Sequence, residues 1–457
     1  MSISRRHLLT RGAGFAALAA LRRMGLGEAL AGSAPYHPYG LLVSDRAGIL
    51  DLPEGYRYTI VNRIGDLMSD GTPTPPRPDG MAAFAGAGGT TILVRNHEMT
   101  VSTSSDNGVR MPAVLRYDAG RGGFVRGGTT TLVLSSTNTL LASYATLGGT
   151  VRNCAGGATP WGSWITCEET TLTPEEDARH AKRHGYCFEI PSGLQGPADP
   201  TPLTAMGRFS HEAVGVDAAT GAIYETEDVN LSSFYRFTPF RKGELAAGGI
   251  LEAMRLVDFP RGVSTDIGFP FRVPFDVEWV KVPNPDPART ETPVATQAQE
   301  AGAAILRRGE GIAWNPFDES FYFTATDGGA ARSGQIFRFA PRAGAKQQGI
   351  LELVLEATAP DSGRSVDEWE WPDNITVTPW GDLVLCKDGP GTQYLYMVTT
   401  ERRVFRFARN ALNGTEFAGC CFSPDGKTLF VNIYGNDTAP GLTLAITGPW
   451  RTRARGR

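Results

Sequence analysis

Three pairs of residues that could bind metal ions recur at one spacing along the sequence. Each pair is separated by 15 positions: Cys154 and Glu169, Glu212 and Glu227, Asp373 and Asp388. Thiolates and carboxylates are common ligands of metal ions in proteins. Each pair flanks the same pattern, in which a short apolar run, a turn containing Pro, Asp or Gly, and a second apolar run follow one another. The spacing indicates a repeated unit with metal ligands at corresponding positions.

The repeated unit is typical of a β-hairpin. Turn residues between two β-rich runs predict a hairpin, and self-similarity at a fixed unit size predicts a repeat architecture. There are three looser copies of the unit: one runs from Glu310 to Asp327, one ends at Glu98 and one ends at Asn432. Further strand-like runs follow most copies, which gives each the three or four strands of a propeller blade. We predict an all-β fold, a six-bladed β-propeller with blades near residues 82–118, 153–190, 212–238, 310–340, 373–398 and 419–448.

The residues that open the inner strands of a propeller gather at one mouth of its channel. Four blades place Cys154, Glu212, Glu310 and Asp373 at this opening position. A single acid at a strand end is usually a solvated turn residue, but three acids and a cysteine in register favour a shared metal site. Most of the other cysteines lie in apolar strand sequence, where cysteine behaves as a small hydrophobic residue. They are Cys167, Cys187, Cys386, Cys420 and Cys421.

The composition fits one large unit and excludes some partners. The chain has 457 residues, a net charge of −4, and 55 Gly and 31 Pro residues that suit many tight turns. The absence of a long basic cluster argues against a nucleic-acid partner. No run of 18 apolar residues follows the N-terminal segment, so we expect no membrane span. We assign residues 32–457 to one propeller domain, with a helix and loop insertion at 241–308 between blades three and four, and expect a monomer.

The first 31 residues predict an export signal rather than part of the fold. The segment 4–9 reads SRRHLL, like a twin-arginine signal, and a modest apolar stretch follows at 12–21. Ala29 to Ala31 offers a small-residue cleavage site. An amphipathic helix with chance arginines is the alternative, because Arg22 and Arg23 follow the apolar stretch. We expect export by the twin-arginine route to the periplasm or the medium.

Several long motifs, in order between about residues 45 and 450, resemble the PhoX-type alkaline phosphatases. They are RNHE at Arg95–Glu98, NCAGGATPWGSWITCEE at Asn153–Glu169, GRFSHEAVGVD at Gly207–Asp217, YETEDVNLSSFYRFTP at Tyr224–Pro239, EGIAW at Glu310–Trp314, PDNITVTPWGDLVLCKDG at Pro372–Gly389 and FSPDGKTLFVNIYG at Phe422–Gly435. The resemblance implies a six-bladed propeller, exported by the twin-arginine route. It also implies a cluster of ferric iron (Fe3+) and calcium (Ca2+) ions with an oxo bridge that hydrolyses small phosphate monoesters.

The resemblance also implies roles for single residues. The metal ligands would be Cys154, on iron through its thiolate, with Glu169 and Glu212, and Glu310 and Asp373 chiefly on calcium. Arg308 would direct its guanidinium at the phosphoryl oxygens, with Glu310 beside it in the catalytic centre. Glu98, Asn96, Asn153 and Asn374 are further candidates, the first as a metal ligand and Asn153 and Asn374 for substrate binding. The donor types agree, since oxygen ligands suit calcium and a thiolate suits a softer, redox-capable metal.

The histidines are expected to have supporting roles. His97 and His211 each precede a candidate glutamate in the same strand, so their side chains face the opposite way and serve packing or ligand support. His180 and His184 form an i, i+4 pair that could bind zinc, but we interpret their polar segment as an exposed surface helix.

Three functions remain open from the sequence. The first is a metal-dependent phosphomonoesterase with a small phosphate-ester substrate. The second is a calcium-dependent hydrolase of another class, such as a lactonase, which also places acids at a channel mouth but does not require a cysteine. The third is a non-catalytic, metal-stabilised binding propeller. The combination of Cys154 with Arg308 favours the first.

Overall fold

The computed structural model describes residues 37–100, 108–122, 125–342, 348–357, 368–436 and 438–451. The chain divides into two compact units, Met1–Gly40 and Leu41–Arg457, and the named strands lie in the second. The predicted export signal, residues 1–31, lies outside the described residues. No helix within the described ranges is long and apolar enough to cross a membrane.

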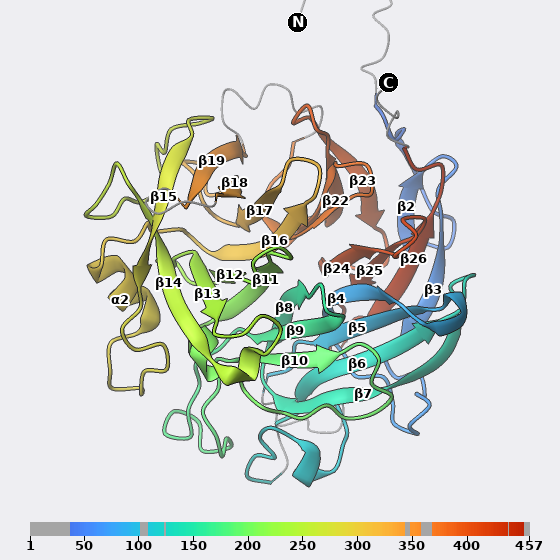
Figure 1. Ribbon diagram of the computed structural model, residues 1–457. Coiled ribbons are helices and arrows are strands. Elements are labelled where there is room, and N and C mark those ends of the chain that lie inside the picture. Colours follow the sequence, from blue (N-terminus) through green and yellow to red (C-terminus); the bar gives the residue numbers. More distant parts are fainter. Residues whose placement is uncertain are drawn as a thin grey trace, which may run out of the picture. The chain divides into compact units, whose positions relative to one another are not determined.

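Six inner strands surround one axis in the unit Leu41–Arg457 (Figure 1). They are β4 (Pro78–Ala85), β8 (Asn153–Ala158), β11 (His211–Val216), β16 (Gly309–Asn315), β20 (Pro372–Val377) and β24 (Phe417–Phe422). Each contacts the next in this order, and β24 contacts β4, so the strands form a closed ring. The all-β propeller predicted from the hairpin repeats is therefore confirmed.

Antiparallel strands continue outward from each inner strand. After β4 come β5 (Thr91–His97), β6 (Gly127–Leu134) and β7 (Leu140–Thr150); after β8 come β9 (Ser163–Glu168) and β10 (Cys187–Pro191); after β11 come β12 (Ile223–Glu227), β13 (Tyr235–Pro239) and β14 (Gly249–Leu256). After β16 come β17 (Ser320–Ala325), β18 (Gln335–Pro341) and β19 (Gly349–Glu356), and after β20 come β21 (Leu383–Lys387), β22 (Tyr394–Val398) and β23 (Val404–Asn410). After β24 come β25 (Leu429–Ile433) and β26 (Leu442–Thr447).

Strands from the beginning of the sequence complete the last two blades. The strand β3 (Arg57–Arg63) pairs with β26, and β2 (Leu50–Pro53) pairs with β23 and carries the short β1 (Leu42–Val43) on its outer edge. Main-chain hydrogen bonds thus join the two ends of the propeller sequence. This pairing covers edges that would otherwise be open to another chain.

The hydrophobic core lies in layers between adjacent blades. In β17 and β18 the buried Phe321 and Phe323 lie directly opposite Phe339 and Phe337. Tyr224 of the preceding blade packs on Phe321, with ring centroids 4.9 Å apart. Because alternate side chains of a strand face the same way, each blade covers the face of its neighbour, and the stacked faces stabilise the ring.

The inner strands approach one another closely because glycines line their contacts. A Cβ atom on Gly80 would lie 2.5 Å from the Cα of Ala155, and one on Gly311 would lie 2.7 Å from the carbonyl oxygen of Asp373. Real side chains do not tolerate such distances, so these positions require glycine. The result is a narrow channel, with a cavity of about 350 Å³ lined by all six inner strands.

The predicted insertion at 241–308 contains more strand than expected. The strand β14 completes blade three, and β15 (Phe275–Lys281) pairs with both β14 and β19, which merges blades three and four into one nine-stranded sheet. Within the insertion, residues 282–293 contain neither helix nor strand, and the helix that follows is α2 (Val294–Glu300). This helix ends before Gly302, which has a φ of 85°, so the helical part of the insertion is short.

The predicted surface helix around His180 and His184 is wrong. The segment forms turns, and both side chains are fully buried. His184 Nε2 lies 3.2 Å from Asp118 Oδ2, and its Nδ1 lies 2.7 Å from Glu168 Oε1. Buried carboxylates on either side of His184 hold the segment against blade two. The polar sequence pattern did not predict this burial because both carboxylates are distant in the sequence.

Candidate metal centre

Each inner strand is irregular at one position near its start, and in five of the six strands a polar residue stands there. The pairing of β8 with β9 shifts between Asn153 and Gly156, around Cys154. Corresponding shifts surround Asp79, Glu212, Glu310, Asp373 and Gly419 in the other inner strands. A bulge frees a residue from the regular ladder and redirects its side chain. The repeated bulges therefore turn residues of different blades toward a common point.

Four of these residues, Cys154, Glu212, Glu310 and Asp373, meet residues from outside the inner strands in three overlapping groups. Within each group the candidate ligand atoms all lie within 4.8 Å of one another. The groups are Cys154, Glu169 and Glu212; Glu212, Glu310 and Asp373; and Asp373, Asp388 and Glu416. We call these seven residues the channel-mouth cluster. It contains five of the six residues predicted as metal ligands, and Glu212 and Asp373 each belong to two groups.

Side chains from neighbouring blades hold the main chain of several members in place. In each case the second strand of one blade donates a hydrogen bond to the carbonyl oxygen of an inner-strand residue in the next. The pairs are Asn96 with Cys154, Thr226 with Glu310, Thr324 with Asp373 and Asn432 with Asp79. Asn96 therefore supports the main chain of Cys154 rather than acting as a ligand. This hydrogen bond accounts for its position near the site.

The cluster concentrates negative charge in a buried place. Burial first, and then the neighbouring Asp373, raise the pKa of the Glu212 carboxyl well above its usual value. Burial and Asp388 raise the pKa of Asp373 to about 7, and burial with nearby acids likewise raises the pKa of Glu310. Burial, Glu212 and Glu169 raise the pKa of the Cys154 thiol. Like charges disfavour joint ionisation, so bound cations are needed to ionise the whole set.

Two arginines lie at the edge of this cluster. Arg308 donates to Asp228 through Nε (2.8 Å) and Nη2 (3.0 Å), and to Glu310 Oε1 at 2.6 Å. Arg152 donates to Glu98 at 3.0 Å and Glu169 at 2.5 Å. Their side chains are 26% and 39% exposed, so both can meet a molecule that arrives from solvent.

The two arginines also share an unusual backbone position. Arg152 and Arg308 have φ values of 50° and 49°, and each stands two residues before a cluster member, Cys154 or Glu310. Left-handed backbone is unfavourable for residues other than glycine, and it is found where function or packing compensates the strain. Arg77 (φ 52°), two residues before Asp79, and Trp371 (φ 53°), two residues before Asp373, share this position, so the geometry recurs at the entry of four inner strands and is not specific to the two guanidinium groups.

The remaining predicted residues lie at different distances from the cluster. Glu98 belongs to none of the three groups; it pairs with Arg152 and accepts a hydrogen bond from the Tyr434 hydroxyl. Asn374 donates to Asp373 Oδ1 at 3.2 Å and accepts from the main chain of Gly419.

The side chain of Asn153, the neighbour of Cys154, makes its hydrogen bonds within the protein. It is fully buried, accepts from Thr150 Oγ1 at 2.5 Å and donates to Thr166 Oγ1 at 3.0 Å. Both of its polar groups are thus occupied inside the protein, and the geometry gives no support to its predicted role in substrate binding.

Sequence reasoning missed several residues around the mouth: Asp79, Arg152, Asp228 and Glu416, with Asp388 noticed only for its spacing. Arg152 could have been found, because it precedes Cys154 by the same two positions that separate Arg308 from Glu310. Asp79 could have been found from its place at the start of the first repeat. Glu416 precedes β24 in a loop and carries no spacing signal.

Comparisons with known proteins identify the family of this chain. The family described as alkaline phosphatase PhoX matches residues 37–141 and 127–437. The chain belongs to this family. It is therefore an alkaline phosphatase, and the reaction of the family is the metal-dependent hydrolysis of phosphate monoesters. No curated protein matches the sequence.

Among solved structures, Pseudomonas fluorescens PhoX in complex with vanadate, a transition state analogue, has the same fold as this PhoX chain. The TM-score is 0.69 at 19% sequence identity, and the match covers 90% of this chain and 97% of that chain. A Xanthomonas campestris gluconolactonase has a TM-score of 0.42 at 14% identity, covering 90% of this chain and 99% of that chain. The first comparison confirms the propeller fold.

Proposed function

We propose that the channel-mouth cluster holds ferric iron and calcium, and that small phosphate monoesters are hydrolysed there. The observation that carries this proposal is the distribution of donor types. One group contains the thiol of Cys154, whereas Glu212, Glu310 and Asp373, like the third group, offer only oxygen atoms. A thiolate suits a softer or redox-capable metal, and oxygen-only groups suit calcium.

The residues fit such ions in charge as well as in type. The carboxyl groups of the cluster have raised pKa values because they are buried among one another. Divalent and trivalent cations would favour the ionised forms of all of them, since an opposite charge lowers a carboxyl pKa. In this assignment Cys154, Glu169 and Glu212 bind iron, and Glu310 and Asp373 bind mainly calcium.

The bound ions would supply Lewis-acid stabilisation of the phosphoryl oxygens and lower the pKa of water. The protein's own contribution is to position positively charged side chains beside the cluster. Arg308, held by Asp228 at the edge of the cluster, can direct a planar guanidinium toward phosphate oxygens. Arg152 lies in the equivalent position of blade two. The buried cluster behind them leaves the exposed mouth as the route of approach for a small ester.

We further propose that the protein is exported by the twin-arginine route and acts as a monomer in the periplasm or the medium. The support for export is the sequence SRRHLL at residues 4–9 with the small residues near position 31. Twin-arginine export carries folded proteins, which would allow the ions to be bound before transport. A fusion of residues 1–35 to a reporter that is active only outside the cytoplasm tests this point, with Arg5→Lys and Arg6→Lys together as the control.

Metal analysis of the purified enzyme, together with hydrolysis of p-nitrophenyl phosphate, tests the proposed centre. We expect iron and calcium in the wild-type protein and phosphatase activity that a chelator abolishes. Cys154→Ser should lose iron, whereas Cys421→Ser, at a buried cysteine outside the three groups, should retain it. An active wild-type enzyme that contains neither iron nor calcium would refute the assignment of the ions.

A further inference from the structure

A second set of metal-binding side chains lies between blades two and three, outside the channel-mouth cluster. Cys187 of β10, His211 of β11 and Glu225 of β12 place their ligand atoms within 4.8 Å of one another. All three side chains are fully buried. His211 directly precedes Glu212, so consecutive residues of one strand contribute to two separate groups.

His211 is oriented as a metal ligand would be. Its Nε2 donates to the carbonyl oxygen of Gly207 at 3.0 Å. In the neutral ring the proton then lies on Nε2, and the lone pair of Nδ1 faces Cys187 Sγ at 3.4 Å and Glu225 Oε2 at 3.3 Å. Metal-bound histidines usually donate their other ring nitrogen to a carbonyl or carboxylate in this way.

Glu225 gives a second, independent indication of a cation site. Apart from the ion pair of Oε2 with His211 Nδ1 at 3.3 Å, neither carboxylate oxygen has a hydrogen-bond partner among the described residues, although the side chain is completely buried. A buried carboxylate without a hydrogen bond is costly, and the ion pair of Glu225 with His211 lacks the geometry of a hydrogen bond. A cation placed between the two side chains would satisfy both.

Cys167 is a candidate fourth donor beside this group, although it lies outside the set of three whose ligand atoms are all within 4.8 Å of one another, so its thiol would have to move closer on binding. Its sulphur lies 3.6 Å from that of Cys187, its partner across β9 and β10. Tetrahedral zinc, with bonds of ~2.3 Å to sulphur and ~2.0–2.2 Å to nitrogen or oxygen, requires ligand separations of about 3.8 Å (S–S), 3.6 Å (S–N) and 3.4 Å (N–O). The observed separations of 3.6, 3.4 and 3.3 Å follow the same order.

We propose that Cys167, Cys187, His211 and Glu225 form a closed structural site for a zinc ion. We call these four residues the thiol pocket. Both thiols would release their protons to solvent on binding. All four positions are occupied by protein, which is typical of structural rather than catalytic zinc.

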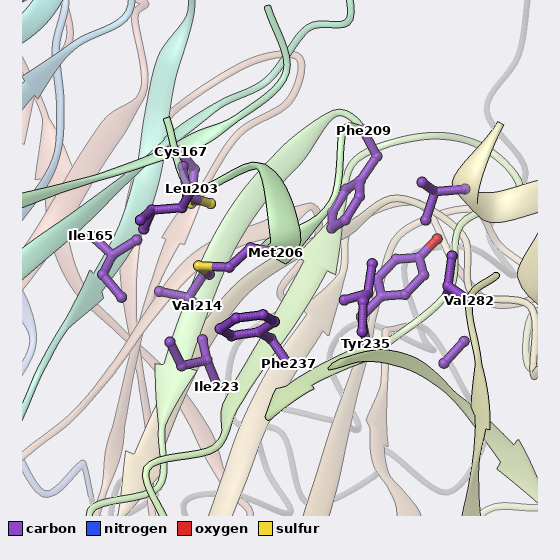
Figure 2. Close-up of a cluster of buried hydrophobic side chains, with 14 of the residues drawn as sticks. Ile165, Cys167, Leu203, Met206, Phe209, Val214, Ile223, Tyr235, Phe237 and Val282 are labelled. Atoms are coloured by element: carbon purple, nitrogen blue, oxygen red, sulfur yellow. Dashed lines mark hydrogen bonds between the residues drawn. The ribbon is translucent and has the colours of Figure 1, made fainter. Parts of the chain in front are cut away.

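The surroundings of the thiol pocket favour a closed site. Figure 2 shows Cys167 at one end of a buried apolar cluster, close to Leu203 and Ile165. Phe209 stacks on the ring of His211 with centroids 3.6 Å apart. Apolar walls exclude water, so the ion would link blades two and three without contact with substrate.

Zinc content provides the test. The purified wild-type protein, equilibrated with one equivalent of Zn2+ and then desalted, is expected to retain about one zinc per chain in addition to the ions of the channel-mouth cluster. Cys187→Ser should lose this zinc, and Cys154→Ser, which changes the thiol of the other site, should retain it. Glu225→Gln, nearly equal in shape, provides a second variant if Cys187→Ser does not fold, and it should lose zinc as well.

Cobalt substitution gives a readout that does not depend on activity. Co2+ in the wild-type thiol pocket should show thiolate-to-cobalt charge-transfer absorption, which Cys187→Ser abolishes and Cys154→Ser preserves. Retention of less than a tenth of an equivalent of zinc by the wild type, or equal zinc in wild type and Cys187→Ser, would overturn the proposal. A Cys167–Cys187 disulfide in the native protein, detected by mass spectrometry, would overturn it too, because oxidised sulphurs about 2.05 Å apart cannot bind the ion.

Discussion

Two neighbouring residues at the end of β9, Glu168 and Glu169, enter buried clusters of opposite character. Glu169 faces the acids of the channel-mouth cluster, and burial followed by Glu98 raises its pKa well above the usual value. Glu168 accepts hydrogen bonds from His184 at 2.7 Å and from the main chain of Val151 and Gly185 at 2.9 Å. Burial alone therefore does not identify a metal ligand.

The comparison shows that the neighbours of a buried acid indicate its role. In the network of Asp118, Glu168 and His184, which we call the blade-two network, one imidazole lies between two carboxylates. Burial would lower the pKa of His184, but Glu168 and Asp118 raise it to about 9. In that network a positively charged imidazole and main-chain donors compensate the two carboxylates in part and support the fold, whereas the channel-mouth cluster has a larger excess of acids and requires ions.

The largest effect is expected from breaking the blade-two network at its centre. His184→Gln removes the cation between Asp118 and Glu168 and leaves two buried carboxylates without it. Removing one partner of a buried ion pair costs ~3–5 kcal/mol. Urea unfolding of the metal-loaded protein should show this loss, while the iron and calcium content per folded molecule stays unchanged. A change below ~1 kcal/mol would mean that the network contributes little to the fold.

The matching change in the channel-mouth cluster should affect function rather than folding. Glu169→Gln keeps the shape of the side chain and removes one charge, so we expect reduced iron content and phosphatase activity lower by ~10²–10³-fold, the range for groups that stabilise transition-state charge. Metal analysis and kcat/KM for p-nitrophenyl phosphate give the measurement. Wild-type metal content and activity in this variant would remove Glu169 from the proposed ligand set.

The pH dependence of stability distinguishes the blade-two network further. The pKa of His184 is raised from 6.5 to about 9 on folding. Its stabilisation is therefore fully present below pH 6.5 and is lost as the pH rises through 9. A rise of that size corresponds to ~3 kcal/mol. The stability difference between wild type and His184→Gln, measured by urea unfolding of the metal-loaded proteins from pH 6 to 10, should decrease over this interval; a constant difference would contradict the charged state of His184.

The smallest effect is expected from replacing the planar guanidinium of Arg308 with another positively charged group. Arg308→Lys retains the charge but loses the planar guanidinium that would contact phosphate oxygens, which we expect to cost ~1.5–3 kcal/mol. Phosphatase kcat/KM should fall about tenfold to a hundredfold with normal metal content. Arg338→Lys, at an exposed ion pair with Asp318, serves as the matched control and should retain full activity. Full activity in Arg308→Lys would exclude the bidentate contact.

Much of the architecture could be predicted from the sequence, because it depends on local patterns. Hairpin turns between β-rich runs recur at a similar unit size, and this repetition predicted the propeller and the opening positions of Cys154, Glu212, Glu310 and Asp373. Two other features are also local: the register shift of β8 around Cys154 and the left-handed backbone of Arg152 and Arg308. The residue types at these positions did not predict either feature.

The sequence by itself determined the repeat and the chemical types that open each inner strand, since both follow from residue order within one hairpin. Only the tertiary structure decided the neighbours of each polar side chain. It placed Glu168 beside His184 and Glu169 among acids, and it brought Glu416 from a loop to the channel mouth. The physical reason is that hydrogen bonds and charge balance depend on contacts between blades, and those contacts exist only after the ring has closed.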